Sequence, residues 1–433
     1  MVTDQQARVQ GLTITDLIIT PIAFADPPLL NSWGVHEPLA LRTVIQVVTA
    51  AGVVGLGECG GGANRLNQLN QVRSQLIGMS IFDTNAIEQR LLSILGTTGE
   101  AGEKDGSVGR SPAVSATFSP IEVACLDAQG KALGVRVVDL LGGPVRDAVP
   151  YSAYLFYKWA EHPARDGSAA ITDGWGAALE PASVVAQAQT MIDTYGFGSI
   201  KLKAGAFPPD QEVAAIKALA EAFPGLPLRI DPNGAWTEAT SVRVGHELAA
   251  ELEYLEDPTL GRAGMAAVAR QVPMPLATNM CVIAFDDIPE ALDLGSIGVV
   301  LSDHHVWGGL RHSLELAGIC RTVGWGMSMH SNSHLGISLA AMTHLGAAVP
   351  NLSYACDTHY PWNSDQEIIA GGALEFVDGS LPVPPGPGLG VELDPDALAR
   401  QHELFVRSGR TERDDTGYLR RSQPDYDPTL PRF

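Results

Sequence analysis

Strand-like apolar runs recur at intervals of 23 to 28 residues through the second half of the chain, and each ends in a chemically capable residue. These residues are Lys203, Asp231, Glu256, Asn279, Asp303, His330 and Asp357. One interval holds a strand, a helix and two short connections, which is the repeat of a parallel β/α barrel. Because the carboxyl ends of all barrel strands open on one mouth, the spacing predicts that these side chains share one site.

The first part of the chain follows a different pattern. Long β-prone runs cover residues 13–24 and 39–50, and a turn then leads into a third strand. Helical patterns follow at residues 67–77, 86–95 and 121–134. The Gly-rich segment 96–112 predicts a loop. Strands followed by helices indicate an α+β domain that is distinct from the repeat.

The 433 residues exceed a barrel of about 250 residues, which leaves room for this second domain. We place the α+β domain at residues 1–147, the barrel at 148–370 and a C-terminal segment at 371–433. The first barrel strand is predicted at 148–158, and the polar connection 159–180 after it is a candidate lid. The C-terminal segment contains a predicted hairpin and Pro/Gly loop and ends in a polar tail.

Composition narrows the possible partners. The net charge of −21 disfavours nucleic acids and anionic membrane surfaces, which attract proteins with an excess of Lys and Arg. The five cysteines are widely spaced and odd in number, as expected for reduced thiols in a reducing compartment. The sequence shows neither a signal-like N-terminus nor an apolar run of about 18 residues, so we expect a cytoplasmic protein without membrane contact.

Asp231, Glu256 and Asn279 end three consecutive predicted strands. Two carboxylates and an amide carbonyl are hard oxygen ligands suited to Mg²⁺. The alternative is that they cap the following helices, since DPN and EDP are also turn sequences. Their occurrence on three adjacent strands favours a metal site, and the absence of soft ligands disfavours structural zinc.

Lys201 and Lys203 lie two residues apart, so a strand directs both side chains to the same face. If that face is the barrel interior, the two like charges lower the pKa of one lysine until it can act as a base. The alternative is a pair on a solvated face, which central parallel strands do not have.

Asp303 and His330 end neighbouring strands, and an aspartate can orient an imidazole and stabilise its protonated form. We interpret the pair as a base opposite the lysine, although a single histidine is more often structural. Either His304 or His305 could face the site, but packing or hydrogen bonding within a loop is the favoured interpretation for both. His334, His344 and Met280 are interpreted as structural.

A lysine, an oxygen-bound divalent metal and an opposite histidine suit the removal of a weakly acidic proton next to a carboxylate. The metal would stabilise the enediolate, a combination already known in enzymes. Without it the doubly negative intermediate would be too costly.

The motifs that surround these residues resemble the enolase superfamily, its mandelate racemase subgroup and, within it, the glucarate dehydratase family. They are KLK, DPNGAW, EDP, ATNM, SDHHVW, MHSNSHLGISLA and CDTHYPW, together with NSWGVHEP, YLFYK, GPGLGVELD and ERDD. The resemblance covers most of the chain. It implies a modified (β/α)7β TIM-type barrel under an α+β capping domain, with a C-terminal segment that returns to the cap.

The resemblance also implies roles. Asp231, Glu256 and Asn279 would bind Mg²⁺, and Lys203 would be one base, assisted by Lys201. His330, paired with Asp303, would be the opposite base. His330 would then also protonate the departing 4-hydroxyl. Asn332 would stabilise the enediolate. The distal part of an acid sugar would contact Asn31, His36, Tyr154, Asp357, His359 and Arg413.

The implied reaction is dehydration of D-glucarate to 5-dehydro-4-deoxy-D-glucarate, with L-idarate able to enter from the lysine side. Three features depart from the family pattern: His304 replaces a common Pro, Ala204 replaces a Gly, and residues 106–110 lack an expected Thr. The alternatives are a dehydratase or epimerase for another aldarate or aldonate, or a non-catalytic metal-binding barrel. We expect a homo-oligomer.

Overall fold

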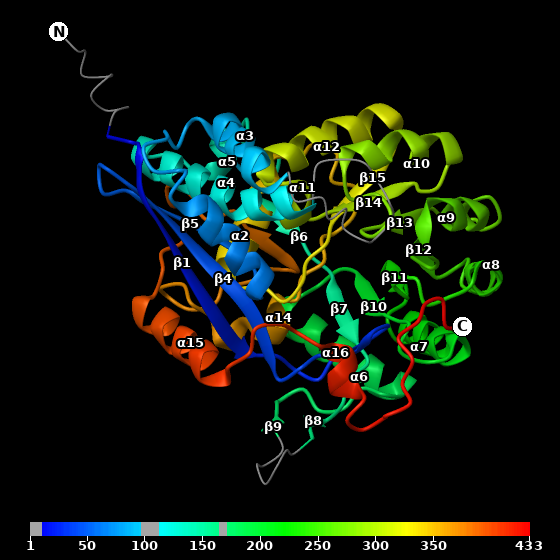
Figure 1. Ribbon diagram of the computed structural model, residues 1–433. Coiled ribbons are helices and arrows are strands. Elements are labelled where there is room, and N and C mark those ends of the chain that lie inside the picture. Colours follow the sequence, from blue (N-terminus) through cyan, green and yellow to red (C-terminus); the bar gives the residue numbers. More distant parts are fainter. Residues whose placement is uncertain (1–10, 97–111, 164–170) are drawn as a thin grey trace.

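The computed structural model describes residues 11–96, 112–163 and 171–433 (Figure 1). Most of the predicted loop at 96–112, including residues 106–110, and part of the candidate lid at 159–180 lie outside the described residues. Figure 1 shows the blue and cyan elements of the N-terminal part beside the green and yellow elements of the barrel. None of the described helices is long and apolar enough to cross a membrane.

The N-terminal domain is an antiparallel sheet covered by helices. The strands are β1 (Ile14–Ala25), β4 (Leu39–Thr49) and β5 (Val54–Gly60), in the order β1-β4-β5. The helices are α2 (Ala63–Arg73), α3 (Thr84–Leu95) and α4 (Pro112–Leu133). Helix α4 packs closely on β5, since a Cβ added to Gly57 would lie 2.0 Å from the carbonyl oxygen of Pro120. The predicted α+β cap is confirmed.

Two helix boundaries differ from the sequence prediction. Helix α4 begins at Pro112 rather than at 121 and contains Pro120 in its interior. Proline costs a helix one hydrogen bond, but buried Val114 and Phe118 bind the first turns of α4 to the cap core. Helix α2 lies four residues earlier than predicted.

The barrel is a seven-stranded parallel sheet in the order β15-β14-β13-β12-β11-β10-β7. Its strands are β7 (Ala153–Phe156), β10 (Ile200–Lys203), β11 (Leu228–Asp231), β12 (Leu252–Glu256), β13 (Leu276–Thr278), β14 (Val299–Ser302) and β15 (Gly326–Met329). The helices that follow them are α6 (Pro181–Tyr195), α7 (Pro209–Ala222), α8 (Glu238–Glu247), α9 (Gly261–Ala269), α10 (Ile288–Leu294), α12 (Leu310–Val323) and α13 (Gly336–Ala348). The strands are buried apolar runs because helices cover the outer face of the sheet.

Residues 352–357 fill the gap between β15 and β7. The N–H of Asp357 donates to the carbonyl of Met329 at 2.8 Å, and the N–H of Cys356 donates to that of Pro150 at 2.8 Å. This segment therefore supplies an eighth strand position and closes the sheet. The predicted (β/α)7β barrel is confirmed.

The predicted strand 148–158 is divided. Only β7 joins the barrel, whereas β6 (Ala148–Pro150) pairs antiparallel with β16 (Ser380–Pro382). The predicted hairpin near residue 380 is thus a tight turn with a β-bridge between Val377 and Ser380. The strand that follows this turn, β16, pairs with β6.

The C-terminal segment packs against the N-terminal domain. Helix α15 (Pro395–Ser408) packs against β1, and α16 (Asp415–Leu419) packs against β3 (Gly34–Val35) (Figure 1). The remaining short elements are β2 (Leu30–Asn31), α5 (Val137–Leu140), β8 (Glu161–His162), β9 (Ile171–Thr172), η1 (Phe285–Asp287), α11 (His304–Trp307), α14 (Tyr360–Asn363) and η2 (Ser364–Gln366). The domain boundaries at 147 and 370 stay a prediction.

Two buried glutamates of the cap bind the N-termini of barrel helices. Glu58 on β5 accepts from the N–H groups of Leu335 at 3.0 Å and Ser338 at 2.9 Å, at the start of α13. It also pairs with Arg42 at 2.8 Å. Burial alone would raise the pKa of Glu58, but Arg42 and these donors outweigh it and lower the pKa. Such contacts fix the cap over the mouth of the barrel.

Glu122 on α4 makes the second contact, accepting from Leu310 N–H at 3.0 Å and Arg311 N–H at 3.2 Å, and burial raises its pKa from 4.5 to about 7. A raised pKa contributes stability below about pH 4.5 that is lost as the pH rises through 7. We therefore compare the free energy of unfolding of the Glu122→Gln variant with that of the wild type. We expect the difference to shift in favour of the variant by about 2–3 kcal/mol when the pH is raised from about 5 to about 8. Urea unfolding at both pH values measures this change.

Glu58→Gln is the matched control. Because the pKa of Glu58 is lowered, its contribution is present above the ordinary carboxyl pKa and does not change between about pH 5 and about pH 8. Equal pH dependence of both variants would contradict the account.

Candidate active site

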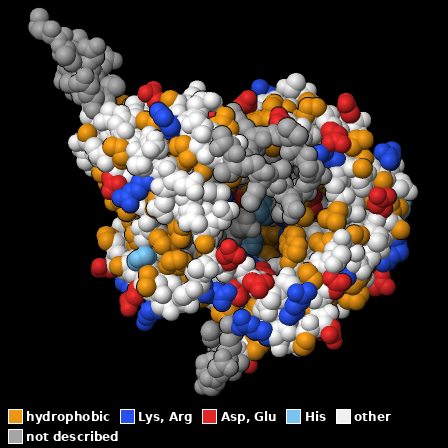
Figure 2. Space-filling view, in the orientation of Figure 1, with side chains coloured by type: hydrophobic (Ala, Val, Ile, Leu, Met, Phe, Trp, Pro, Cys, Tyr) orange, Lys and Arg blue, Asp and Glu red, His pale blue; other side chains and the backbone are white. Residues whose placement is uncertain are grey.

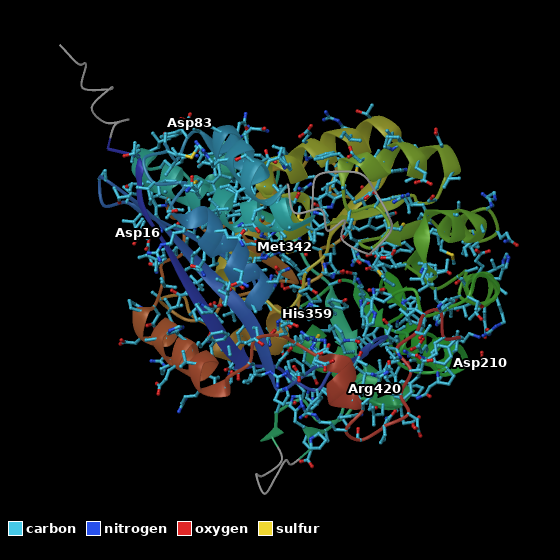
Figure 3. All side chains as sticks on the ribbon, in the orientation of Figure 1. Asp16, Asp83, Asp210, Met342, His359 and Arg420 are labelled. Atoms are coloured by element: carbon cyan, nitrogen blue, oxygen red, sulfur yellow. The ribbon has the colours of Figure 1, made fainter. Side chains whose placement is uncertain are left out.

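A cavity of about 770 Å³ opens where the cap, the barrel mouth and the C-terminal segment meet. Figure 2 shows a hollow near the centre of this face with histidine surface at its edge, and Figure 3 places His359 there. Ten of the predicted site residues line the cavity: Asn31, His36, Tyr154, Lys203, Asn279, Asp303, His330, Asn332, His359 and Arg413. The structure thus brings most of the predicted set together.

The other four predicted residues, Lys201, Asp231, Glu256 and Asp357, are fully buried and absent from the cavity wall. Lys201 Nζ lies 2.6 Å from Glu256 Oε1 and 2.6 Å from Asp357 Oδ2. Lys203 Nζ lies 2.6 Å from Asp231 Oδ2. Both lysines thus point into the barrel, and the alternative of a solvated pair is excluded.

The charges in this buried group change the protonation expected from the sequence. Burial alone would lower the pKa of Lys201, but Asp357 and Glu256 outweigh it and raise the pKa well above its ordinary value. Like charge was expected to lower the pKa of one of the two lysines, and Lys201 is not that lysine, because carboxylates surround it. Lys201 is therefore a fixed positive charge.

Asp357, predicted to bind substrate, is buried and does not line the cavity. Its side chain is buried beneath the cavity, between Lys201 and the guanidinium of Arg229, whose Nη1 lies 3.5 Å from Asp357 Oδ1. Arg229 is itself held by Glu253 at 2.5 Å. Asp357 anchors Lys201 in this structure.

The predicted metal ligands can be tested against their surroundings. Glu256 Oε2 is buried and has no hydrogen-bond partner among the described residues. Burial and the charge of Asp231 raise the pKa of Glu256 well above its ordinary value. The amide of Asn279 lies 3.2 Å from Glu256 Oε1. An orphaned carboxylate oxygen beside a second carboxylate and an amide fits a hard divalent cation.

Asp257, which sequence reasoning did not select, supports this group. It accepts from Thr278 Oγ1 at 2.5 Å and from the N–H of Asn279 at 2.9 Å, and it has a left-handed backbone with φ of 35°. Burial raises its pKa to about 7. The residue lies directly after Glu256 in the EDP motif, and this adjacency was the available signal.

Asp303 binds two imidazoles. Its Oδ2 lies 3.2 Å from His330 Nδ1, as predicted, and its Oδ1 lies 2.8 Å from His305 Nδ1. Burial alone would raise the pKa of Asp303, but the histidines outweigh it and lower the pKa well below its ordinary value. His305 lines the cavity, a placement that the sequence left open, and it also makes the hydrogen bonds expected of it. Met280, expected to be structural, also lines the cavity.

Charged and aromatic side chains form the cavity wall on the side of the cap. Arg413 donates to both oxygens of Asp415 at 2.7 Å, and its Nη1 lies 3.5 Å from Asp26 Oδ2. Asn31 Nδ2 donates to Asp415 at 3.2 Å, and His36 Nδ1 lies 3.1 Å from Asp26. Arg413 is the partly exposed cation of this group.

His359 lies between the cap side and the barrel floor. Its ring centroid lies 4.8 Å from that of Tyr154 and 6.3 Å from that of His36. Burial, together with the neighbouring His36, lowers the pKa of His359 well below its ordinary value. A neutral imidazole here can donate or accept one hydrogen bond without adding charge.

Family comparisons agree with this geometry. The N-terminal domain of mandelate racemase and muconate lactonizing enzyme matches residues 34–142, and an enolase C-terminal domain-like model matches residues 183–397. The chain belongs to the enolase superfamily, in its mandelate racemase and muconate lactonizing enzyme subgroup. The resemblance to this superfamily and subgroup that the motifs indicated is therefore confirmed.

Individual relatives match this chain over nearly its whole length. A probable glucarate dehydratase from Streptomyces coelicolor is 51% identical over 98% of this chain and 100% of its own length. The structure of a Gibberella zeae enolase complexed with magnesium, formate and sulfate is 52% identical, with a TM-score of 0.94 and 99% of each chain covered. A Mycobacterium smegmatis enolase complexed with tartrate is 57% identical, with a TM-score of 0.92 over 97% of this chain and 98% of that one.

Proposed function

We propose that this protein is a Mg²⁺-dependent dehydratase of a sugar diacid, with D-glucarate as substrate and 5-dehydro-4-deoxy-D-glucarate as product. The observation that carries the proposal is the placement of two candidate bases. Lys203 ends β10 and His330 directly follows β15, and the three strands whose ends present the candidate metal ligands lie between β10 and β15. The two bases therefore approach a bound substrate from different sides of the mouth.

Three residues would hold the metal: Asp231, Glu256 and Asn279. When bound there, Mg²⁺ would neutralise the negative charge that develops on the substrate carboxylate during proton removal. Lys201, kept charged by Asp357, adds positive charge from below. Asn332, at the cavity wall, would donate a hydrogen bond to the same oxygens.

His330 would remove the proton from carbon 5, and the electron pair of the broken C–H bond would enter the enediolate. Collapse of the enediolate expels the hydroxyl of carbon 4, which takes the proton from the His330 imidazolium and leaves as water. The resulting enol tautomerises to the 5-keto product. Asp303 would hold the imidazole with Nδ1 protonated, so that Nε2 is free to receive the proton.

The cap side of the cavity supports a substrate with a second polar end. Arg413 is the cation there, with Asn31 and His36 beside it, and a carboxylate is the group a guanidinium recognises best. The Mycobacterium smegmatis relative was solved with tartrate, a short diacid, and the Streptomyces coelicolor relative is named a probable glucarate dehydratase. A different aldarate is the second candidate, since the same contacts fit any diacid of similar length.

The direct test is incubation of the protein with Mg²⁺ and D-glucarate, with NMR detection of the 4-deoxy-5-keto product. We expect turnover that EDTA abolishes and Mg²⁺ restores. Turnover of another sugar diacid alone would reject D-glucarate and keep the reaction class. Activity that EDTA leaves unchanged would contradict the metal assignment.

A further inference from the structure

We propose that His305 is a positioning residue for the base His330, and that it acts by fixing the carboxylate of Asp303. For its kinetic consequences the inference rests on the proposed function. The carboxylate has two separate tasks in the structure. Oδ2 faces His330 Nδ1 at 3.2 Å, whereas Oδ1 accepts both the backbone N–H of His305 at 2.9 Å and its ring Nδ1–H at 2.8 Å.

The direction of the bond between His305 and Asp303 follows from the partner. Asp303 is ionised, since its pKa is well below the ordinary value, and an ionised carboxylate only accepts hydrogen bonds. His305 Nδ1 must therefore carry a proton. With its ring and backbone donors on one oxygen, the carboxylate cannot rotate without breaking two hydrogen bonds, so Oδ2 stays directed at His330.

The far side of the His305 ring is held by the cap and by α13. Its Nε2 lies 3.0 Å from Ser338 Oγ, 3.1 Å from the carbonyl oxygen of Glu58 and 3.3 Å from Arg42 Nη2. The ring also packs against the His304 ring, with centroids 3.9 Å apart and the planes tilted by 34°. His305 therefore connects the docked cap to the carboxylate that orients the base.

This arrangement predicts what each face of the ring does. The Nδ1 face fixes Asp303 and hence His330, whereas the Nε2 face only attaches the ring to its surroundings. Preorganisation of this kind raises the rate by holding a reacting group in its productive geometry. The ring acts through Asp303, because the Asp303 carboxylate lies between His305 and His330.

Two variants separate the two faces. In His305→Asn the amide nitrogen can take the place of Nδ1, so the bond to Asp303 is kept and the Nε2 contacts are lost. In His305→Gln the amide nitrogen instead reaches the place of Nε2, so the side-chain bond to Asp303 is lost and only the backbone bond remains. We expect His305→Gln to lower kcat by about 10–100-fold with KM nearly unchanged, and His305→Asn to retain most of the wild-type kcat.

The decisive readout needs no substrate. Nitrogen NMR of ¹⁵N-histidine protein distinguishes the two tautomers of a neutral imidazole, and a His330→Asn sample assigns the signals. We expect His330 to be in the Nδ1–H tautomer in the wild type and in His305→Asn, and in a mixture of tautomers in His305→Gln. Because this measurement is made on the resting protein, it stands even if D-glucarate is not turned over.

Ser338→Ala tests the competing explanation, in which His305 only docks the cap. This variant removes one Nε2 contact and leaves the bond to Asp303. We expect a wild-type His330 tautomer and a wild-type kcat. The proposal is overturned if His305→Gln leaves the tautomer unchanged, or if Ser338→Ala and His305→Asn change it as much as His305→Gln does. If His305→Gln does not fold, the Ser338→Ala and His305→Asn results still decide between the two explanations.

Discussion

The His330→Asn variant is expected to lose dehydration of D-glucarate, with kcat reduced by about 10²–10⁴-fold, the usual contribution of a general acid–base group. His330 would both accept the proton from carbon 5 and return it to the departing hydroxyl, so both steps fail together. The substitution removes no charge partner from the buried lysines. The KM for D-glucarate should therefore change little, and steady-state assays of purified protein measure both constants.

The matched control is His402→Asn on α15. His402 Nδ1 contacts the carbonyl oxygen of Pro21 at 2.7 Å, and neither residue lines the cavity, so kcat should stay within about twofold of the wild type. A His330→Asn variant with nearly normal kcat would contradict the assignment of His330 as the base for D-glucarate.

The Glu256→Gln variant is expected to lose both Mg²⁺ binding and activity. Glu256 offers the buried, unpartnered oxygen of the candidate metal group, and glutamine replaces one carboxylate oxygen with an amide that donates. A metal supplies several kcal/mol of stabilisation to a developing negative charge, so the loss should lower kcat by about 10³-fold. Isothermal titration calorimetry with MgCl₂ measures the binding.

Thermal unfolding gives an independent readout of the same prediction. At 100 times the dissociation constant, Mg²⁺ should stabilise the wild type by about 2.7 kcal/mol and the Glu256→Gln variant hardly at all. The control is Glu247→Gln on α8, where the carboxylate forms an exposed pair with Lys217 at 2.7 Å. Equal Mg²⁺ binding by wild type and Glu256→Gln would contradict the proposed ligand set.

Much of the site could be predicted from the spacing of polar residues along the chain. A parallel barrel brings the carboxyl ends of its strands together, so residues at the ends of successive strands must meet. Lys203, Asp231 and Glu256 end β10, β11 and β12, and His330 directly follows β15. This regularity indicated the candidate metal ligands and the candidate opposite base before the structure was known.

The same spacing does not predict which of these side chains line the cavity and which are buried beneath it. Asp357 occupies the last position of the series but is buried with Lys201 and Arg229, because the eighth strand position is irregular and its side chain faces buried cations. Asp303 contacts both His330 and His305, and the far side of the His305 ring contacts the carbonyl oxygen of Glu58 in the cap. Contacts between distant parts of a chain leave no local sequence pattern.

Helix α15 was missed although its boundaries carry signals. Asp394 caps the helix through bonds to two N–H groups, Pro395 occupies its first position, and Gly409 ends it in a left-handed conformation. The extension of α4 to Pro112 has no such signal, because an interior proline argues against it and only packing in the cap restores it.

Hydrogen exchange at carbon 5 in D₂O tests the two-base account most directly. We predict that His330→Asn exchanges this hydrogen in L-idarate through Lys203 but not in D-glucarate, and that Lys203→Met shows the reverse selectivity. Loss of exchange with both sugars to the same extent in both variants would contradict two independent bases on different sides of the site.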